Sequence, residues 1–70
     1  MTLREYRGSL AWSLSELARR SGLTYITVSR VEKGEPAYFH TVAAIAKALS
    51  EGLGKTVTVE DIEGVVIREF

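Results

Sequence analysis

Residues 13–34, SLSELARRSGLTYITVSRVEKG, decide the fold, because they predict two short helices joined by a tight turn. Ser13 followed by Glu16 three residues later is the pattern of a capped helix start. Gly22 can adopt the left-handed conformation that ends a helix, and Thr24 can cap the next one. A glycine-containing turn of this length lets the second helix project into the DNA major groove. An ordinary helical hairpin in a small bundle is the alternative that the spacing leaves open.

The flanking sequence predicts a helix on either side of this pair. Thr2 and Glu5 form a T-x-x-E capping box, so a first helix is expected to begin directly after Thr2. A fourth helix is predicted from Phe39 to Glu51, with Gly52 and Gly54 breaking it. Its apolar residues have the spacing of a single buried stripe and are Val42, Ile45, Ala46 and Leu49.

The C-terminal segment predicts a short fifth helix and a strand. Thr58 opens an element over Val59 to Glu63, which Gly64 closes. The last six residues, VVIREF, are β-branched and aromatic and favour a strand, for which the chain offers no partner strand. We therefore expect an all-α, compact five-helix domain over residues 1–64, with a β-type tail over residues 65–70.

Length and composition favour a binding module over an enzyme. The chain has 70 residues, enough for one small domain. It lacks cysteine and has one histidine, which excludes disulfides, thiolate metal sites and histidine-rich metal clusters. Its longest stretch without Asp, Glu, Lys or Arg, residues 36–46, is too short to span a bilayer, and the N-terminus does not resemble a secretory signal. We expect a cytoplasmic protein without metal, cofactor or small-molecule ligand.

The net charge of zero is unevenly distributed along the chain. Residues 1–50 carry seven basic and four acidic side chains, and residues 51–70 carry two basic and five acidic ones. This asymmetry suggests that the N-terminal part faces a polyanion and that the tail has a different use. A surface that merely happens to be divided this way explains the charge equally well.

Residues 13–34 resemble the helix-turn-helix of Cro/C1-type, phage-repressor-like proteins. The resemblance rests on Glu16-Leu17-Ala18, on Gly22 in the turn, and on the sequence SRVEKG at residues 29–34, which matches the family's S-R-x-E-x-G ending. It extends over about residues 3–63. It implies a five-helix cytoplasmic fold that binds operator DNA, usually as a two-fold dimer, with the third helix as recognition helix. The expected function is a sequence-specific regulator, a repressor that occupies its operator; the alternative is a protein-interaction or antitoxin-like module.

The resemblance assigns base reading to Tyr25, Ile26, Ser29 and Arg30, and buried positions to Val28 and Val31. Helical periodicity agrees, since residues facing away from the two valines lie outward. Arg30 is the strongest candidate, because a guanidinium can bind guanine O6 and N7 together. Pairing of Arg30 with Glu16 or with a phosphate is the alternative. Ile26 can instead pack against the turn.

Contacts to DNA phosphates are expected around the same helices. Leu14 replaces a glutamine common in the family, so only the backbone N–H groups there can serve a phosphate. Tyr38 and His40 either donate to phosphates or seal the edge of the core, and Thr27 is a boundary residue. The expected phosphate contacts are Ser13, Leu14, Arg19, Arg20, Thr24, Thr27, Lys33, Tyr38 and His40, with Arg7 and Lys47 as further cations.

So few cations predict weak binding by a single chain, and a dimer would raise the affinity through a second half-site. The tail can supply the contact between two chains, through a self-complementary patch. The expected dimerisation residues are Val65, Val66, Ile67 and Phe70. Folding of the tail over its own core is the alternative.

Overall fold

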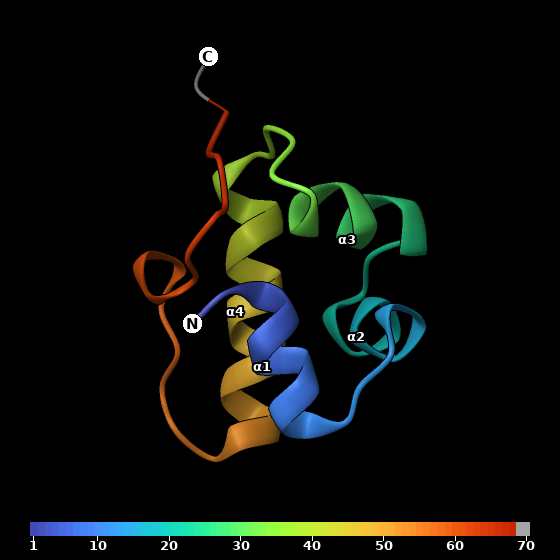
Figure 1. The fold of residues 1–70 in the computed structure, drawn as a ribbon, viewed down its shortest axis with the longest axis vertical. Coiled ribbons are helices and arrows are strands. Elements are labelled where there is room, and N and C mark those ends of the chain that lie inside the picture. The colour runs from blue at the N-terminus through green and yellow to red at the C-terminus, as the bar shows by residue number, and fades with distance from the viewer. Residues whose placement is uncertain (69–70) are drawn as a thin grey trace.

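The computed structural model describes residues 1–68, which form four α-helices and one turn of 3₁₀ helix (Figure 1). The elements in chain order are α1 (Leu3–Leu10), α2 (Leu14–Ser21), α3 (Tyr25–Glu32), α4 (Phe39–Leu53) and the 3₁₀ turn η1 (Val59–Asp61). The expectation of five helices is therefore corrected to four within these 68 residues.

The predicted fifth helix shortens to η1 because the chain leaves the helical path at Ile62. This residue is extended (φ −90°, ψ 107°) and only 4% exposed, so its side chain joins the core. The next N–H group, that of Glu63, donates to the carbonyl of Met1 at 3.0 Å instead of continuing the helix. Burial of the Ile62 side chain is thus favoured over a further helical turn.

The predicted helix starts at residues 3, 14 and 25 are confirmed by their caps. In α1, the Thr2 hydroxyl accepts from the N–H of Glu5 at 3.2 Å, and the Glu5 carboxylate accepts from the N–H of Thr2 at 2.8 Å. In α2, Ser13 accepts from the N–H of Glu16 at 3.0 Å, but the Glu16 carboxylate bonds elsewhere, so only half of that capping box forms. Thr24 caps α3. Each cap satisfies an N–H group that would otherwise lack a partner.

The prediction that Gly52 breaks α4 is wrong, since the helix continues to Leu53. A Cβ atom on Gly52 would lie only 2.5 Å from the Trp12 ring, so the ring packs where any other residue would carry a side chain. Gly52 is therefore a packing glycine within the helix. Gly54 is the residue that ends it, in a left-handed conformation (φ 70°).

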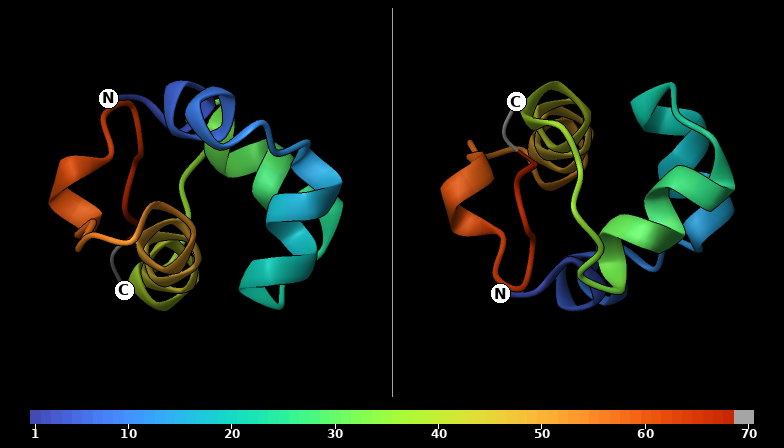
Figure 2. Two further views of the ribbon diagram at one scale, coloured as in Figure 1. Left: turned by 90° about the horizontal axis from the view of Figure 1, so that it is seen from below. Right: turned by 90° about the horizontal axis from the view of Figure 1, so that it is seen from above.

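Helix α4 forms the centre of the molecule. Seen end-on in Figure 2, it has α1, α2 and α3 on one side and η1 with the tail on the other. Its predicted apolar stripe is buried, with Ala48 added to it. Burial of each Val, Leu or Ile side chain contributes about 1.5–3 kcal/mol. The largest fully buried side chains are those of Leu17, Val28, Val31, Val42, Ile45 and Leu49.

The prediction of a strand at residues 65–70 is wrong for the part that the structure describes. The tail instead lies alongside its own chain through one isolated bridge between Ala37 and Ile67. The N–H of Ala37 donates to the carbonyl of Val66 at 2.9 Å. The pairing does not lengthen into a ladder, because the N–H of Glu35 donates to the carbonyl of Arg30 at 3.0 Å and α4 begins two residues after Ala37.

The alternative for the tail, folding back over its own core, is the one that the described residues follow. Val65 and Ile67 are partly buried and pack against the core, whereas Val66 is 46% exposed. Phe70 lies outside the described residues. Among residues 1–68, no helix has the length and apolar character that crossing a membrane requires.

Candidate nucleic-acid interface

The turn between α2 and α3 has the geometry predicted from Gly22. This glycine is left-handed (φ 72°, ψ 24°), and its N–H faces the carbonyl groups of Ala18 and Arg19. The N–H of Leu23 donates to the carbonyl of Ala18 at 2.9 Å, which completes the helix end. Only Gly22, Leu23 and Thr24 separate α2 from α3, so the turn holds the second helix close to the first.

Helix α3 has one buried face and one exposed face. Val28 and Val31 are 0% and 2% exposed, as expected for the side toward the core. At the start of the helix, Tyr25 and Ile26 are 53% and 61% exposed. Packing against the turn therefore does not cover Ile26. The face predicted to read bases is open to solvent along its first turn.

Arg30 lies on this exposed side one turn further along α3. The structure gives it no ion pair with any residue from 1 to 68, and the expected alternative pairing with Glu16 does not form. Ser29, beside it, is half-buried. Arg30 borders a cleft of about 240 Å³ between α3 and the start of α4, whose lining residues are Thr27, Arg30, Val31, Pro36, Ala37, Tyr38 and Thr41.

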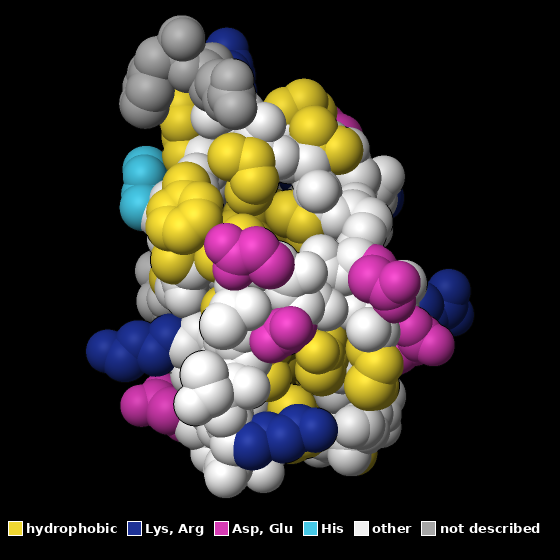
Figure 3. All heavy atoms as spheres, turned by 90° about the vertical axis from the view of Figure 1, so that its left-hand side faces the viewer, with side chains coloured by type: hydrophobic (Ala, Val, Ile, Leu, Met, Phe, Trp, Pro, Cys, Tyr) yellow, Lys and Arg dark blue, Asp and Glu magenta, His cyan; other side chains and the backbone are white. Residues whose placement is uncertain are grey.

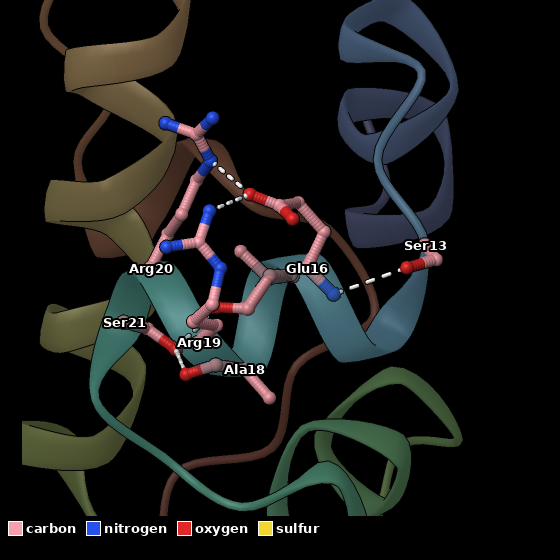
Figure 4. Close-up of polar contacts among 7 residues, drawn as sticks. Ser13, Glu16, Ala18, Arg19, Arg20 and Ser21 are labelled. Atoms are coloured by element: carbon pink, nitrogen blue, oxygen red, sulfur yellow. Dashed lines mark hydrogen bonds and ion pairs between the residues drawn. The ribbon is translucent and has the colours of Figure 1, made fainter.

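Glu16 binds two of the arginines predicted to contact phosphates (Figure 4). Its Oε2 accepts from Arg19 Nη2 at 2.5 Å and from Arg20 Nε at 2.6 Å. These hydrogen bonds, Arg19 first, lower the pKa of Glu16. The Arg20 guanidinium also lies 4.6 Å from the centre of the Trp12 ring, a cation–π contact. The charge of both arginines is thus partly neutralised within the protein.

Arg19 and Arg20 also lie away from α3. In Figure 4 their side chains extend from α2 on the side away from the α3 ribbon. They line a second cleft, of about 440 Å³, together with Lys47 and Glu51 of α4. Lys47 and Glu51 carry opposite charges, so α4 adds no net charge to this cleft. The structure therefore does not bring these arginines together with Arg30.

The predicted hydroxyl donors serve the helix starts. Thr24 Oγ1 accepts from the N–H of Thr27 at 3.2 Å, and the two threonine hydroxyls lie 2.9 Å apart. Ser13 is exposed, and its hydroxyl oxygen accepts a hydrogen bond from the N–H of Glu16. The side chain of Leu14 packs against the core, which leaves backbone groups as its route to a phosphate.

The residues between α3 and α4 lie close to Arg30. Tyr38 lines the same cleft as Arg30 and is 37% exposed. Its ring stacks on that of His40, with centres 5.7 Å apart and planes 7° from parallel. His40 and Lys33 are exposed. Arg30, Thr27 and Tyr38 thus surround one cleft, with Lys33 at the end of the same helix.

Arg7 is not available to a phosphate, contrary to the expectation from its charge. Its Nε and Nη2 bind the two carboxylate oxygens of Glu32 at 2.7 and 3.0 Å, and its Nη1 donates to the carbonyl of Trp12 at 2.9 Å. Only 16% of its side chain is exposed. Arg7 connects α1 to α3 and belongs to the fold.

Comparison with protein families gives a match to a helix-turn-helix model over residues 3–59. The chain belongs to the Cro/C1-type helix-turn-helix family. Comparison with curated proteins and with solved structures gave no match. The resemblance seen in residues 13–34 is thereby confirmed. Members of this helix-turn-helix family bind DNA and are not normally enzymes.

Two residues of this helix-turn-helix domain have roles that the sequence did not reveal. Glu32 binds Arg7 across 25 positions, and Arg68 lies over Tyr38 across 30 positions. No local spacing could have indicated either contact. The binding of Arg19 and Arg20 to Glu16 was different, because spacings of three and four residues place side chains together on a helix.

Proposed function

We propose that this helix-turn-helix protein is a sequence-specific, double-stranded DNA-binding transcriptional regulator that represses by occupying its operator. The exposed face of α3 would enter the major groove, whose width of about 12 Å admits a helix. The observation that carries the proposal is Arg30, which is exposed on the side of α3 away from Val28 and Val31 and has no ion pair within the described chain.

Arg30 is the proposed base reader because its guanidinium can bind two acceptors of one guanine. Such a bidentate contact is worth about 1–3 kcal/mol of discrimination between bases. Tyr25 and Ile26 would add apolar contacts to thymine methyl groups, and Ser29 a hydrogen bond. The cleft beside Arg30 would receive the DNA backbone, with Tyr38, Thr27 and Lys33 as phosphate contacts.

Selection of binding sites from a random duplex library, at two salt concentrations, tests the proposal. The selected sites should share a motif, and Arg30→Ala should weaken binding to that motif by about 5- to 100-fold. Lys55→Ala, which removes an exposed cation beyond the far end of α4, is the matched control and should leave binding to the motif unchanged. Equal binding by wild type and Arg30→Ala would show that Arg30 is not the reader.

We also propose that two chains form a two-fold dimer through the tail and the start of α4. Val66 and Phe39 are 46% and 56% exposed there, and Val65 and Ile67 lie half-buried beside them. Figure 3 shows hydrophobic side chains gathered in the upper part of this face, with acidic side chains below them. A dimer would place two α3 helices on successive major-groove turns of the operator.

Sedimentation of wild type and Val66→Asp tests the dimer. The wild type should sediment with twice the mass of one chain, and Val66→Asp with the mass of one chain. Ile26→Asp is the control, since it adds the same charge at an exposed apolar position on another face. Wild type that sediments as one chain, both free and on DNA, would refute the dimer.

Tyr25 and Ile26 also support a second candidate function, a protein-interaction module. They form an apolar rather than an ionic surface at the start of α3. Salt distinguishes the two functions, because DNA binding weakens steeply with added salt and apolar contact between proteins does not.

A further inference from the structure

The C-terminal tail lies beside the segment that connects α3 to α4. Ala37 is the point of attachment: its N–H donates to the carbonyl of Val66 at 2.9 Å, and its carbonyl accepts from the N–H of Arg68 at 2.7 Å. The inward side chain of Ile67 packs against the core between these two hydrogen bonds. The backbone of Arg68 is therefore held beside Ala37, two residues before the start of α4.

The side chain of Arg68 continues from this attachment onto Tyr38. Its guanidinium carbon lies 5.6 Å from the centre of the Tyr38 ring, within the range of a cation–π contact. The Tyr38 ring also stacks on the His40 ring, with the ring centres 5.7 Å apart. Arg68 itself is exposed and has no ion pair in the described part of the chain.

Tyr38 connects this cation to the candidate interface. The cleft of about 240 Å³ beside Arg30 has Tyr38 as one of its walls. Arg68 does not itself line this cleft, but it lies over the ring of Tyr38, which lines the cleft together with Arg30. The view from above in Figure 2 shows the coloured part of the tail, up to residue 68, beside the start of α4.

We infer that Arg68 is a DNA-phosphate contact supplied by the tail, an inference that rests on the proposed function. An arginine binds a phosphate with two parallel N–H donors, and contact with a ring on one side leaves the edge of the guanidinium free to donate. Tyr38 acts as the positioning residue that holds the guanidinium in place. From the sequence, the tail is expected to form a dimer contact or to pack on its own core, and a contact with DNA is not among these expectations.

The distribution of the other cations leaves few of them near α3 for the DNA backbone. Arg7 is bound to Glu32, and Arg19 and Arg20 share Glu16 on the side away from α3. The exposed cations in and directly after α3 are then Arg30 and Lys33. A third cation beside the cleft raises the charge opposing the DNA backbone, on which affinity for any sequence depends.

Anisotropy titrations of a random-sequence duplex with the full chain, over a series of potassium chloride concentrations, test this inference. Arg68→Ala should weaken binding about fivefold at low salt and reduce the slope of log affinity against log salt by about 0.9. Arg68→Lys should retain the slope, because it keeps the charge. Lys55→Ala is the control for loss of one positive charge and should leave the slope unchanged.

The outcomes separate this inference from the function on which it rests. An Arg68→Ala slope equal to that of wild type, with Arg30→Ala still impaired on the selected motif, would overturn the role of Arg68 and leave DNA binding intact. Wild type that binds no duplex at low salt would overturn both. If Arg68→Ala destabilises the fold in thermal melts, Arg68→Lys and Arg68→Gln decide, since a merely structural role would change the melting temperature and not the salt slope.

Discussion

Some polar side chains of this domain stabilise the fold, and others remain available to bind a ligand. The pair of Arg7 and Glu32 is the clearest of the first kind, with 16% and 19% of the two side chains exposed. It ties α1 to the end of α3, one turn beyond Val28 and beside the buried Val31. Any change in this pair therefore bears on the position of the helix that carries Arg30.

A double-mutant cycle on Arg7 and Glu32 should show strong coupling. Removing one partner leaves the other charge half-buried without its counter-charge, so Arg7→Met or Glu32→Gln alone should cost about 1–2 kcal/mol after allowance for solvent screening. Such a loss lowers the melting temperature of a domain this small by roughly 4–16 °C. The double variant should lose less than the two single variants together, with a coupling of about 0.5–3 kcal/mol.

Thermal and urea unfolding followed by circular dichroism measures all four proteins of the cycle. Losses that simply add would show that the two side chains do not stabilise one another. Arg4→Met, which removes an exposed arginine from the same helix, is the control and should change the melting temperature little.

At the scale of the elements, helix starts and helix ends differ in how far the sequence determines them. The starts of α1, α2 and α3 depend on Thr2, Ser13 and Thr24, whose hydroxyls reach N–H groups three residues on, so local sequence predicts them. The end of α1 lies at Ala11, a non-glycine residue in a left-handed conformation (φ 57°) that no composition rule favours. Helix α4 continues through Gly52, which the Trp12 ring covers from 40 positions away, and ends at Gly54.

Two glycine-to-alanine substitutions within helices should have opposite effects. Gly52→Ala places a Cβ 2.5 Å from the Trp12 ring, and the resulting overpacking should cost about 1–3 kcal/mol despite the better helix propensity of alanine. At Gly8 an added Cβ meets nothing within 4 Å. Gly8→Ala should therefore stabilise the domain by about 0.5–1 kcal/mol.

Urea unfolding of the two variants checks this prediction. Because both substitutions remove the same backbone freedom from the unfolded chain, they act as controls for one another. A stabilised Gly52→Ala protein would show that the Trp12 ring moves aside without loss of stability.

At the scale of the whole molecule, local patterns predicted the helical pair and the exposed face of α3, and long-range contacts decided the rest. The alternation of Val28 and Val31 with Tyr25, Ile26 and Arg30 needs only helical geometry. The pairing of the tail with Ala37 needs two segments 30 positions apart to meet, and VVIREF alone reads as a strand. The sequence likewise shows that Arg7 and Arg68 are charged, but it does not show that they contact Glu32 and Tyr38, because both contacts join distant segments.

Acid should destabilise the whole domain through three carboxylates at helix starts and ends. The N–H group and then the hydroxyl of Thr2 lower the pKa of Glu5, and Thr58 lowers the pKa of Asp61 in the same way. Hydrogen bonds from Arg19 and Arg20 lower the pKa of Glu16. In each case the folded state holds the proton less readily than the unfolded state, whose pKa values are near 4.5 for glutamate and 3.8 for aspartate.

The sign of the pH dependence follows from these lowered pKa values. The contribution of each group to stability is complete above its pKa in the unfolded chain and is lost as the pH falls through its pKa in the folded chain. The melting temperature should therefore be level from about pH 7 to pH 5 and should fall below about pH 4.5.

The triple variant Glu5→Gln, Glu16→Gln, Asp61→Asn tests this prediction. Its melting temperature should be lower than that of wild type at pH 7 and should fall less on acidification. Substituting Glu35, Glu51 and Glu60 by glutamine removes three exposed acids to which the structure gives no hydrogen bond within residues 1–68, so this control should keep the acid loss of wild type. Parallel curves for wild type and the first triple variant would mean that acid acts through the general gain of positive charge and not through the three helix-terminal carboxylates.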